Sequence, residues 1–285
     1  LCPNCDIPLN YHKRDDTLRC HHCGYQTSSI SYTCACGSHT FLKLGYGTER
    51  AYEEISQFFP SAKVLRLDSD VSSNHVRKEI LESFARGEAN ILIGTEIIAK
   101  GLDFPKVTLA CILDADSSVR IPSYLSDERT FDLISQFVGR AGRQKLKGKI
   151  ILQTYVPENP IIQMAARQDY DAFYQFEIEQ RKQYQYPPYT HLTRIQIKGV
   201  DLEEVINASE TIKNYLMVKI KGKRFNLYGP MTPYISHING RYYRQILLKY
   251  KSEDEADEIL SSLKSLLSEI KKAEVIIDVD PQDNA

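Results

Sequence analysis

The sequence lacks the features of a membrane or secreted protein. No apolar run approaches the length needed to span a bilayer, and the first thirty residues are polar and cysteine-rich, unlike a signal peptide. The net charge is only −1, so the overall charge gives no support to nucleic-acid binding unless basic residues gather on one surface. We therefore expect a cytoplasmic protein that does not contact a membrane.

A phosphate-binding loop of the Walker A type is also missing. Gly148-Lys149 is followed by Ile150 instead of Ser or Thr, and no glycine stands at the required distance before it. Asp114-Ala115-Asp116 mimics an acidic magnesium pair, but a role at a lobe interface or beside DNA suits it better. Because the chain starts at Leu1 and zinc-type cysteines begin at the second residue, we expect a fragment of a longer protein.

Composition and periodicity divide the chain into four predicted regions: residues 1–44, 45–158, 159–189 and 190–285. The second stretch alternates helix-like segments near 49–59, 74–86 and 127–138 with apolar runs at 64–67, 91–93, 107–113 and 150–152. Runs that are apolar nearly throughout are typical of strands buried on both faces of a parallel sheet. This stretch is therefore predicted to be an α/β domain with helices flanking a parallel sheet.

The last part of the chain has a different pattern. Residues 159–185 read as a helical connector that ends at Pro187-Pro188. After it we predict strand 191–198, helix 202–218, strands 225–229 and 242–250, helix 253–271 and strand 274–279. The order β-α-β-β-α-β is that of a ferredoxin-like α+β domain.

Six of the seven cysteines lie within the first thirty-six residues, which in a reducing compartment favours metal over disulfides. Cys2-x-x-Cys5 and Cys20-x-x-Cys23 are separated by fourteen residues. Each C-x-x-C turn directs two sulfurs at one metal, so the four thiolates predict a closed, structural zinc site. The seventh cysteine, Cys111, lies in an apolar run and is interpreted as a core residue.

Cys34-Ala35-Cys36 remains outside this site. The pair could combine with Cys20 and Cys23, but Cys2 and Cys5 would then be stranded. A second site whose other ligands precede Leu1 is the better interpretation. Three histidines, His21, His22 and His39, could substitute, although histidines beside cysteines are as often plain surface residues.

The segment from Gln136 to Arg143, QFVGRAGR, places Arg140 and Arg143 on a glycine-rich backbone after a predicted helix. Guanidinium groups match phosphate oxygens bidentately, and glycines such as Gly139 let the main chain approach closely. An arginine finger that reaches an ATP γ-phosphate across a cleft contributes about 10³–10⁵ in rate. The alternative is a solvated basic turn. Its position after the helix and before strand 149–153 favours the catalytic interpretation.

A second segment, ILIGTEIIAKGLDFP, runs from residue 91 to 105. Gly94 and Thr95 end an apolar strand and can offer a backbone N–H and a hydroxyl to a DNA phosphate. Lys100 and Asp103 follow on a short turn, and Asp103 can reach the nucleotide ribose or an arginine. Taken alone, the segment could equally be an ordinary strand–loop–helix.

In the last domain, Gly240-Arg241-Tyr242-Tyr243-Arg244 interleaves aromatic rings with guanidinium groups. Bases stack on aromatic side chains at about 1–3 kcal/mol each, and strand alternation places Arg241 and Tyr243 on one face. An edge strand with a buried tyrosine and solvated arginines is an equal alternative.

Together, the two segments resemble motifs V and VI of superfamily 2 helicases. The wider set resembles the PriA family of primosomal replication-restart helicases (primosomal protein N′). The resemblance runs through CPNC, CHHCG, GYGTE, RLDSD, ILIGTEIIAKGLDFPKVTL, DADS, QFVGRAGR, LQTY, YDAFY, PPY and the terminal DVDP. It covers nearly the whole chain.

The resemblance implies an ATP-dependent 3′→5′ DNA helicase, bacterial and nucleoid-associated, that recognises branched DNA and reloads the replication machinery. This chain would supply a RecA-like second motor lobe, with Gln136, Gly139, Arg140, Arg143 and Asp103 near ATP. Partners would be single-stranded and fork DNA, other primosome proteins and single-stranded-DNA-binding protein. ATP with Mg²⁺ would bind mainly to a lobe outside this chain, so the chain alone is predicted to be inactive.

The resemblance also implies two zinc ions in the complete protein. Cys2, Cys5, Cys20 and Cys23 would hold one, and Cys34 and Cys36 would complete the other with an upstream pair. The family's last pair is C-x-x-C, whereas this chain has C-x-C. The alternative function is a non-catalytic zinc-dependent module that binds DNA or docks proteins. A zinc-ribbon transcription or RNA-processing factor would explain residues 1–36 but not GRAGR.

Overall fold

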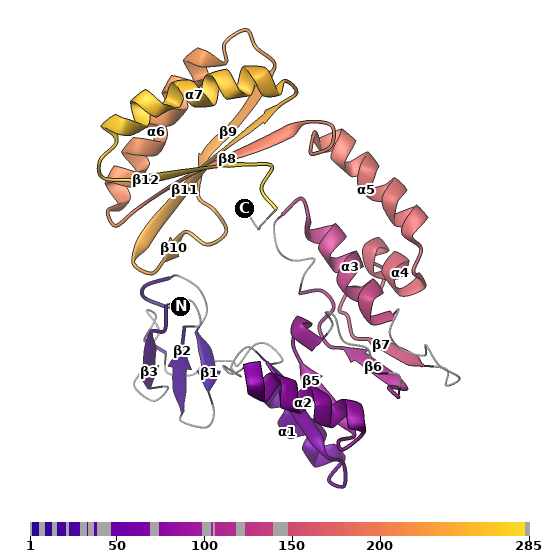
Figure 1. Cartoon of the computed structure of the whole chain (residues 1–285). Helices are drawn as coiled ribbons and strands as arrows, with labels where there is room; N and C mark the ends of the chain where they lie inside the picture. Colours follow the sequence, from indigo (N-terminus) through magenta and orange to yellow (C-terminus); the bar gives the residue numbers. More distant parts are fainter. Residues whose placement is uncertain are drawn as a thin grey trace. The chain divides into compact units, whose positions relative to one another are not determined.

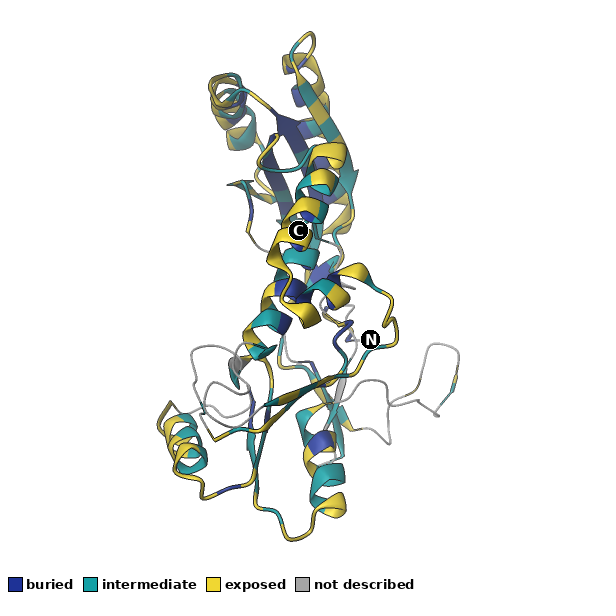
Figure 2. Ribbon diagram, turned by 90° about the vertical axis from the view of Figure 1, so that its right-hand side faces the viewer, coloured by how far each residue is buried: buried dark blue, intermediate teal, exposed yellow. Residues whose placement is uncertain are grey.

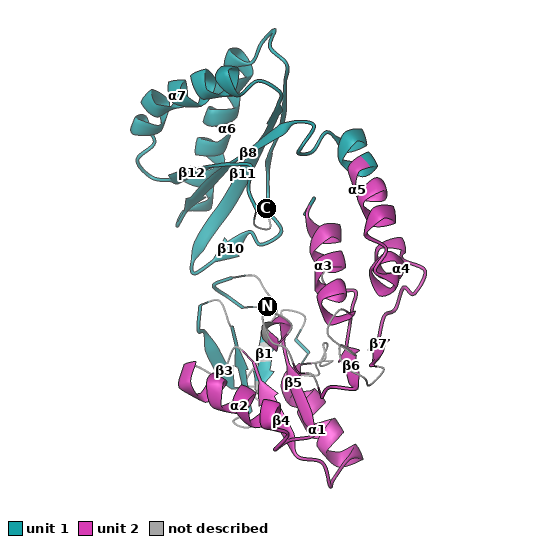
Figure 3. Cartoon of the chain, turned by 45° about the vertical axis from the view of Figure 1, so that its right-hand side comes forward, with its two compact units in different colours: residues 1–43, 122–124, 179–285 teal, residues 44–121, 125–178 magenta. Residues whose placement is uncertain are grey.

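The computed structural model describes residues 2–5, 9–12, 16–20, 23–28, 33, 37–38, 47–68, 74–98, 104, 106–117, 123–138 and 148–282. The chain divides into two compact units (Figure 3). The first comprises residues 1–43, 122–124 and 179–285, and the second comprises residues 44–121 and 125–178. Within the described ranges, every helix is too short or too polar to cross a bilayer.

The second unit alternates helices and short strands in the predicted order. It contains α1 (Thr48–Phe58), β4 (Val64–Leu67), α2 (Asn74–Arg86), β5 (Ile91–Gly94), η1 (Glu96–Ile98), β6 (Leu109–Ile112), α3 (Ser126–Val138), β7 (Lys149–Leu152) and α4 (Pro160–Arg167). Helix α5 (Tyr170–Tyr184) begins in this unit, and its residues from 179 on belong to the first unit. Strands β4 and β5 pair in parallel, as do β6 and β7. The parallel pairing predicted from the apolar runs is therefore present.

The burial of these strands differs from the prediction. Leu109 on β6 and Ile151 on β7 are about half exposed, at 51% and 46%. Helices α3 and α4 pack on one side of this strand pair, where Ile112 joins their buried residues. The expectation of strands buried on both faces is thus wrong for β6 and β7, because the described helices cover only one side of them.

The segment predicted as one helical connector is two helices. Asn159 caps α4 by accepting hydrogen bonds from the backbone N–H groups of Ile161 and Ile162, with Pro160 at the first helical position. The helix ends at Gln168, whose φ of 55° is left-handed and stops the helical hydrogen-bond pattern. Helix α5 then begins at Tyr170, and its Phe173 stacks on Phe131 of α3 with ring centroids 4.1 Å apart.

The C-terminal domain (residues 191–279) has the predicted order of elements with one added short strand. They are β8 (His191–Gly199), α6 (Leu202–Lys219), β9 (Phe225–Met231), β10 (His237–Ile238), β11 (Arg241–Tyr250), α7 (Glu253–Glu269) and β12 (Glu274–Val279). The antiparallel sheet has the order β10-β11-β8-β12, and β9 also pairs with β11.

Helices α6 and α7 cover one face of this sheet (Figure 1). Ile195, Ile246 and Ile277 lie in one cross-strand row, and the first two are fully buried in the core between sheet and helices. Figure 2 shows the buried residues gathered along these strands. Lys198, Tyr243 and Glu274 form another cross-strand row three residues further along, and the strand alternation turns it to the opposite face.

The N-terminal segment holds a sheet that the sequence pattern did not predict. Strands β1 (Asn10–His12), β2 (Thr17–Arg19) and β3 (Gln26–Ser28) pair antiparallel in chain order. Each strand has only three residues, which is too short for an alternating pattern to be recognised. We call residues 2–28 the cysteine ribbon.

Candidate functional site

Four cysteines of the cysteine ribbon converge on one point. The Sγ atoms of Cys2, Cys5, Cys20 and Cys23 all lie within 4.8 Å of one another. Cys2, Cys5 and Cys20 are buried, at 1%, 0% and 1% exposed, while Cys23 is half-buried. Two C-x-x-C turns, one at the start of the chain and one following β2, thus bring together the four sulfurs that the spacing predicted.

The turns hold their sulfurs with backbone amides. Asn4 N–H donates to Cys2 Sγ at 3.4 Å, and Tyr25 N–H donates to Cys23 Sγ at 3.4 Å, so each turn repeats the same i to i+2 bond. Gly24 permits the second turn because its φ is 74°, a conformation that favours glycine. Its N–H donates to Cys20 O at 2.9 Å. The backbone of each turn therefore directs its two sulfurs toward the same point.

The electrostatics of the cluster suit a cation. Burial raises the pKa of the Cys5 thiol to about 12, whereas the hydrogen bond from Tyr25 N–H lowers the pKa of Cys23 to about 7. A bound metal ion reverses the cost of burying thiolates and deprotonates them. The Sγ atoms of Cys2 and Cys23 are 3.6 Å apart. Zinc–sulfur bonds of about 2.3 Å in a tetrahedron separate sulfurs by about 3.8 Å, so these residues fit Zn²⁺.

The remaining candidate zinc ligands cannot be placed. Cys34 and Cys36, as well as His21, His22 and His39, lie outside the described residues. Cys111 was interpreted as a core residue, and that interpretation is wrong: its side chain is exposed on β6. The reason is the one-sided cover of β6 and β7, which leaves alternate residues of β6 facing solvent.

The arginines of the GRAGR segment lie outside the described residues, together with Gly139, Lys100 and Asp103. The element before them is well defined. Phe131 and Ile134 of α3 are buried against α4 and α5, and Gln136 is exposed in the last turn of α3. The chain therefore leaves a firmly packed helix two residues before Arg140.

Gly94 has a packing role that its sequence context did not reveal. A Cβ atom at this position would overlap the carbonyl oxygen of Leu67 and come within 2.8 Å of Ile98 Cγ2. Only glycine allows β5 to end this close to β4 and to the following η1 turn. Thr95, directly after it, is exposed. The structure thus brings the predicted DNA-contacting hydroxyl to the surface at the end of a strand.

Two aspartates in the segments DADS and RLDSD are buried and join parts of the chain through hydrogen bonds. Asp116 of DADS is buried and accepts hydrogen bonds from Thr154 Oγ1 at 2.6 Å and Tyr155 N–H at 2.8 Å. This carboxylate ties the segment after β6 to the segment after β7. Asp68 of RLDSD is likewise buried and accepts from Thr48 Oγ1 at 2.7 Å.

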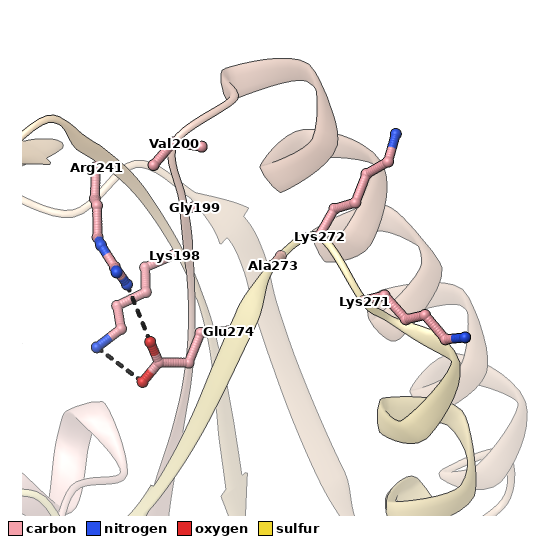
Figure 4. A pocket seen from close by; sticks show the side chains of 8 residues that line it. All are labelled: Lys198, Gly199, Val200, Arg241, Lys271, Lys272, Ala273 and Glu274. Atoms are coloured by element: carbon pink, nitrogen blue, oxygen red, sulfur yellow. Dashed lines mark hydrogen bonds and ion pairs between the residues drawn. The ribbon is translucent and has the colours of Figure 1, made fainter.

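Arg241 and Tyr243 lie at the start of β11 on the sheet face away from the helices. Arg241 Nη1 lies 3.1 Å from Glu274 Oε2, and Lys198 Nζ lies 3.0 Å from Glu274 Oε1 (Figure 4). The hydrogen bond from Lys198 lowers the pKa of Glu274. These side chains, with Lys271 and Lys272, line a shallow cavity of about 230 Å³. Sequence reasoning missed the contribution of Lys198, because it lies 43 residues away from Arg241 in the chain and pairs through the sheet register.

Comparison with known proteins covers each part of the chain. Family models match the PriA DNA helicase Cys-rich region domain at residues 2–27, the helicase conserved C-terminal domain at 41–145, and the primosomal protein N C-terminal domain at 182–282.

Relatives that match nearly the whole chain are replication restart proteins of the same family. The chain is 38% identical over 282 residues to the replication restart protein PriA of Bacillus subtilis, covering 98% of this chain and 35% of that protein. It is 35% identical over 281 residues to the PriA protein of Thermotoga maritima, covering 98% of this chain and 36% of that protein. The chain thus spans about a third of the length of the curated relatives it matches.

Proposed function

We propose that this chain, which belongs to the PriA family of replication restart proteins, forms the second motor lobe, zinc region and C-terminal domain of an ATP-dependent 3′→5′ DNA helicase. Such a helicase would recognise branched DNA and restart stalled forks by primosome assembly. The observation that carries the proposal is the helicase C-terminal match over residues 41–145, which contains α3 and the GRAGR segment that follows it.

In this proposal Arg140 and Arg143 are the catalytic residues. ATP would also be bound by Gln136, Gly139 and Asp103. The DNA backbone would be contacted by Gly94, Thr95 and Lys100. Packing of Phe131 and Ile134 supports the arginines, because it anchors the helix that leads into them. ATP and Mg²⁺ would be held mainly by a lobe carrying a Walker A motif, which this sequence lacks.

The arginine assignment is tested by R140A and R143A in a protein that also carries the Walker A lobe. Loss of an arginine finger should lower DNA-stimulated ATP turnover by about 10³–10⁵-fold and leave DNA affinity nearly unchanged. The matched control is R167A, which removes an exposed arginine at the end of α4. Equal losses of turnover and DNA affinity in R140A would contradict the assignment.

The finer architecture belongs to the same proposal. We assign residues 1–44 to the zinc region, 45–158 to a RecA-like lobe, 159–189 to a helical connector and 190–285 to a ferredoxin-like domain. Parallel pairing of β4 with β5 and β6 with β7 supports the second assignment. Two helices on one face of an antiparallel sheet support the last.

The sheet face away from α6 and α7 is proposed to contact single-stranded DNA at the start of β11, through Arg241 and Tyr243. A guanidinium has five N–H donors, so the bond to Glu274 leaves donors that can reach a phosphate. Tyr243→Ala should weaken single-stranded DNA binding by about 1–3 kcal/mol, the value of one stacked base. The matched control is Tyr234→Ala, which removes an exposed tyrosine between β9 and β10. Equal affinities of the two variants would reject this face.

The proposed metal content is one Zn²⁺ held by Cys2, Cys5, Cys20 and Cys23, with a structural role because four thiolates leave no open position. A second Zn²⁺ would use Cys34 and Cys36 with ligands from outside this chain. The alternative function, a non-catalytic zinc module that binds DNA or docks primosome proteins and single-stranded-DNA-binding protein, is favoured by the missing Walker A motif. DNA-stimulated ATPase activity of this chain alone would contradict both descriptions.

A further inference from the structure

The hairpin between β10 and β11 carries two backbone N–H groups directed away from its own ladder. Its turn residues are Asn239 and Gly240, with φ values of 52° and 72°. Both are left-handed, as a two-residue type I′ hairpin turn requires, and Asn-Gly is the preferred sequence for that turn. In such a turn the flanking residues make the cross-strand bonds, so the amides of the two central residues are available to other partners.

Both amides are used by the cysteine ribbon. Asn239 N–H donates to Cys5 Sγ at 3.3 Å, and Gly240 N–H donates to Asn4 O at 3.0 Å. These contacts join residues more than two hundred positions apart in the chain, within one compact unit. The Asn239 bond differs from the backbone N–H bonds that Asn4 and Tyr25 donate to the cluster, because it comes from outside the ribbon.

Packing reinforces the contact. Ile238, the residue before the turn, packs against the buried cluster of Cys2, Cys5 and Cys20. Cys5 is the most deeply buried of the four ligands, with 0% of its surface exposed. An apolar side chain and a backbone amide from the C-terminal domain thus contact the same cysteine cluster.

We propose that the Asn239–Gly240 turn is an outer-shell part of the metal site, and that metal binding and docking of the cysteine ribbon on the C-terminal domain are coupled. This rests on the proposed Zn²⁺ at the four cysteines. Zn²⁺ bonded to all four cysteines would fix the position of Cys5 Sγ, and Asn239 N–H donates to that sulfur at 3.3 Å. A metal-bound Cys5 therefore holds the turn more firmly than a metal-free Cys5.

The coupling is reciprocal. If zinc favours the docked turn, the docked turn must increase zinc affinity by the same factor. Outer-shell partners of metal ligands typically change affinity by about 10- to 100-fold when they are removed. Arg241, the first residue of β11, directly follows the turn, so its placement becomes dependent on the metal.

The first experiment measures zinc release from the 285-residue chain into an excess of a coloured chelator. Gly240→Val forces a branched side chain into a left-handed φ and should distort the turn. Gly222→Val is the matched control: Gly222 has a φ of 79°, and open space surrounds both glycines. Gly240→Val should release zinc about 10- to 100-fold faster than the wild type, and Gly222→Val at the wild-type rate.

The second experiment needs no variant. Amide hydrogen exchange at Asn239 and Gly240 is compared between the zinc-loaded and chelator-stripped wild-type chain, with the middle of β11 as an internal reference. Faster exchange at these two amides after stripping, with unchanged exchange in the middle of β11, supports the coupling. Zinc-independent exchange, with equal release from both glycine variants, overturns the coupling but leaves the metal assignment intact. A chain that binds no zinc overturns both.

Discussion

The cysteine ribbon and the C-terminal domain belong to one compact unit but are stabilised in opposite ways. Among the described ribbon residues, the buried side chains are those of Cys2, Cys5 and Cys20. The C-terminal domain buries a mostly aliphatic cluster from β8, β11, α6 and α7, and partly buried side chains of β9 and β12 pack against it. A short segment cannot bury enough apolar surface to offset its conformational entropy, so its stability is concentrated in one metal centre. The stability of the larger domain comes from the burial of many side chains.

Metal removal should cause the largest loss of stability, and it should affect the cysteine ribbon but not the C-terminal domain. Structural zinc sites contribute about 10–16 kcal/mol of binding free energy at neutral pH, which is lost on chelation under reducing conditions. We expect amide protection of β1 to β3 to disappear while protection of β8 and β11 persists, as measured by hydrogen exchange. Persistent protection of the ribbon strands after complete removal of zinc would contradict the idea that the metal centre stabilises the ribbon.

A single core truncation in the C-terminal domain should give an intermediate effect. Ile195 is fully buried in the middle of β8, opposite Ile246 and Ile277. Ile195→Ala should lower the free energy of unfolding by about 2–5 kcal/mol in urea titrations, through lost burial and a cavity. Ile276→Ala is the control, since Ile276 is 39% exposed on the neighbouring strand. Equal losses in the two variants would mean that this core is not the main source of stability.

A helix cap in the C-terminal domain should give the smallest effect of the three. Ser252 is the N-cap of α7, and its Oγ accepts a hydrogen bond from Glu255 N–H at 3.4 Å. Ser252→Ala should cost about 1 kcal/mol, and Ser252→Asp should retain the cap. Thermal unfolding of both variants measures the difference. A loss as large as that of Ile195→Ala would show that stability in this domain is less evenly distributed than its core suggests.

Local patterns in the sequence predicted much of the fold. The helix at 74–86 and the strand at 64–67 have the predicted bounds, and the elements of the C-terminal domain lie within two residues of theirs, apart from the added β10. The spacing of Cys2, Cys5, Cys20 and Cys23 likewise predicted their convergence. These features depend on periodicity and short-range geometry, which the order of residues records directly.

Contacts between distant segments could not be predicted in the same way. The ribbon strands are too short to carry a period, and the exposure of Cys111 depends on which face of β6 the helices cover. The pairing of Arg241 with Glu274 depends on sheet register. The Asn239 bond to Cys5 had one usable signal, because Asn-Gly predicts a tight hairpin turn, but its partner does not follow from that pattern.

We expect the hydrogen bond of Gly240 N–H to Asn4 O to slow a chemical change at Asn239 as well. Asn-Gly sequences are prone to spontaneous deamidation, in which the glycine nitrogen attacks the asparagine side chain to form a cyclic imide. Here that nitrogen donates its hydrogen bond to Asn4 O. We expect prolonged storage of the chelator-stripped chain to convert Asn239 to aspartate and isoaspartate faster than storage of the zinc-loaded chain, as followed by peptide mass spectrometry. The docked ribbon would then protect the turn between β10 and β11 from deamidation.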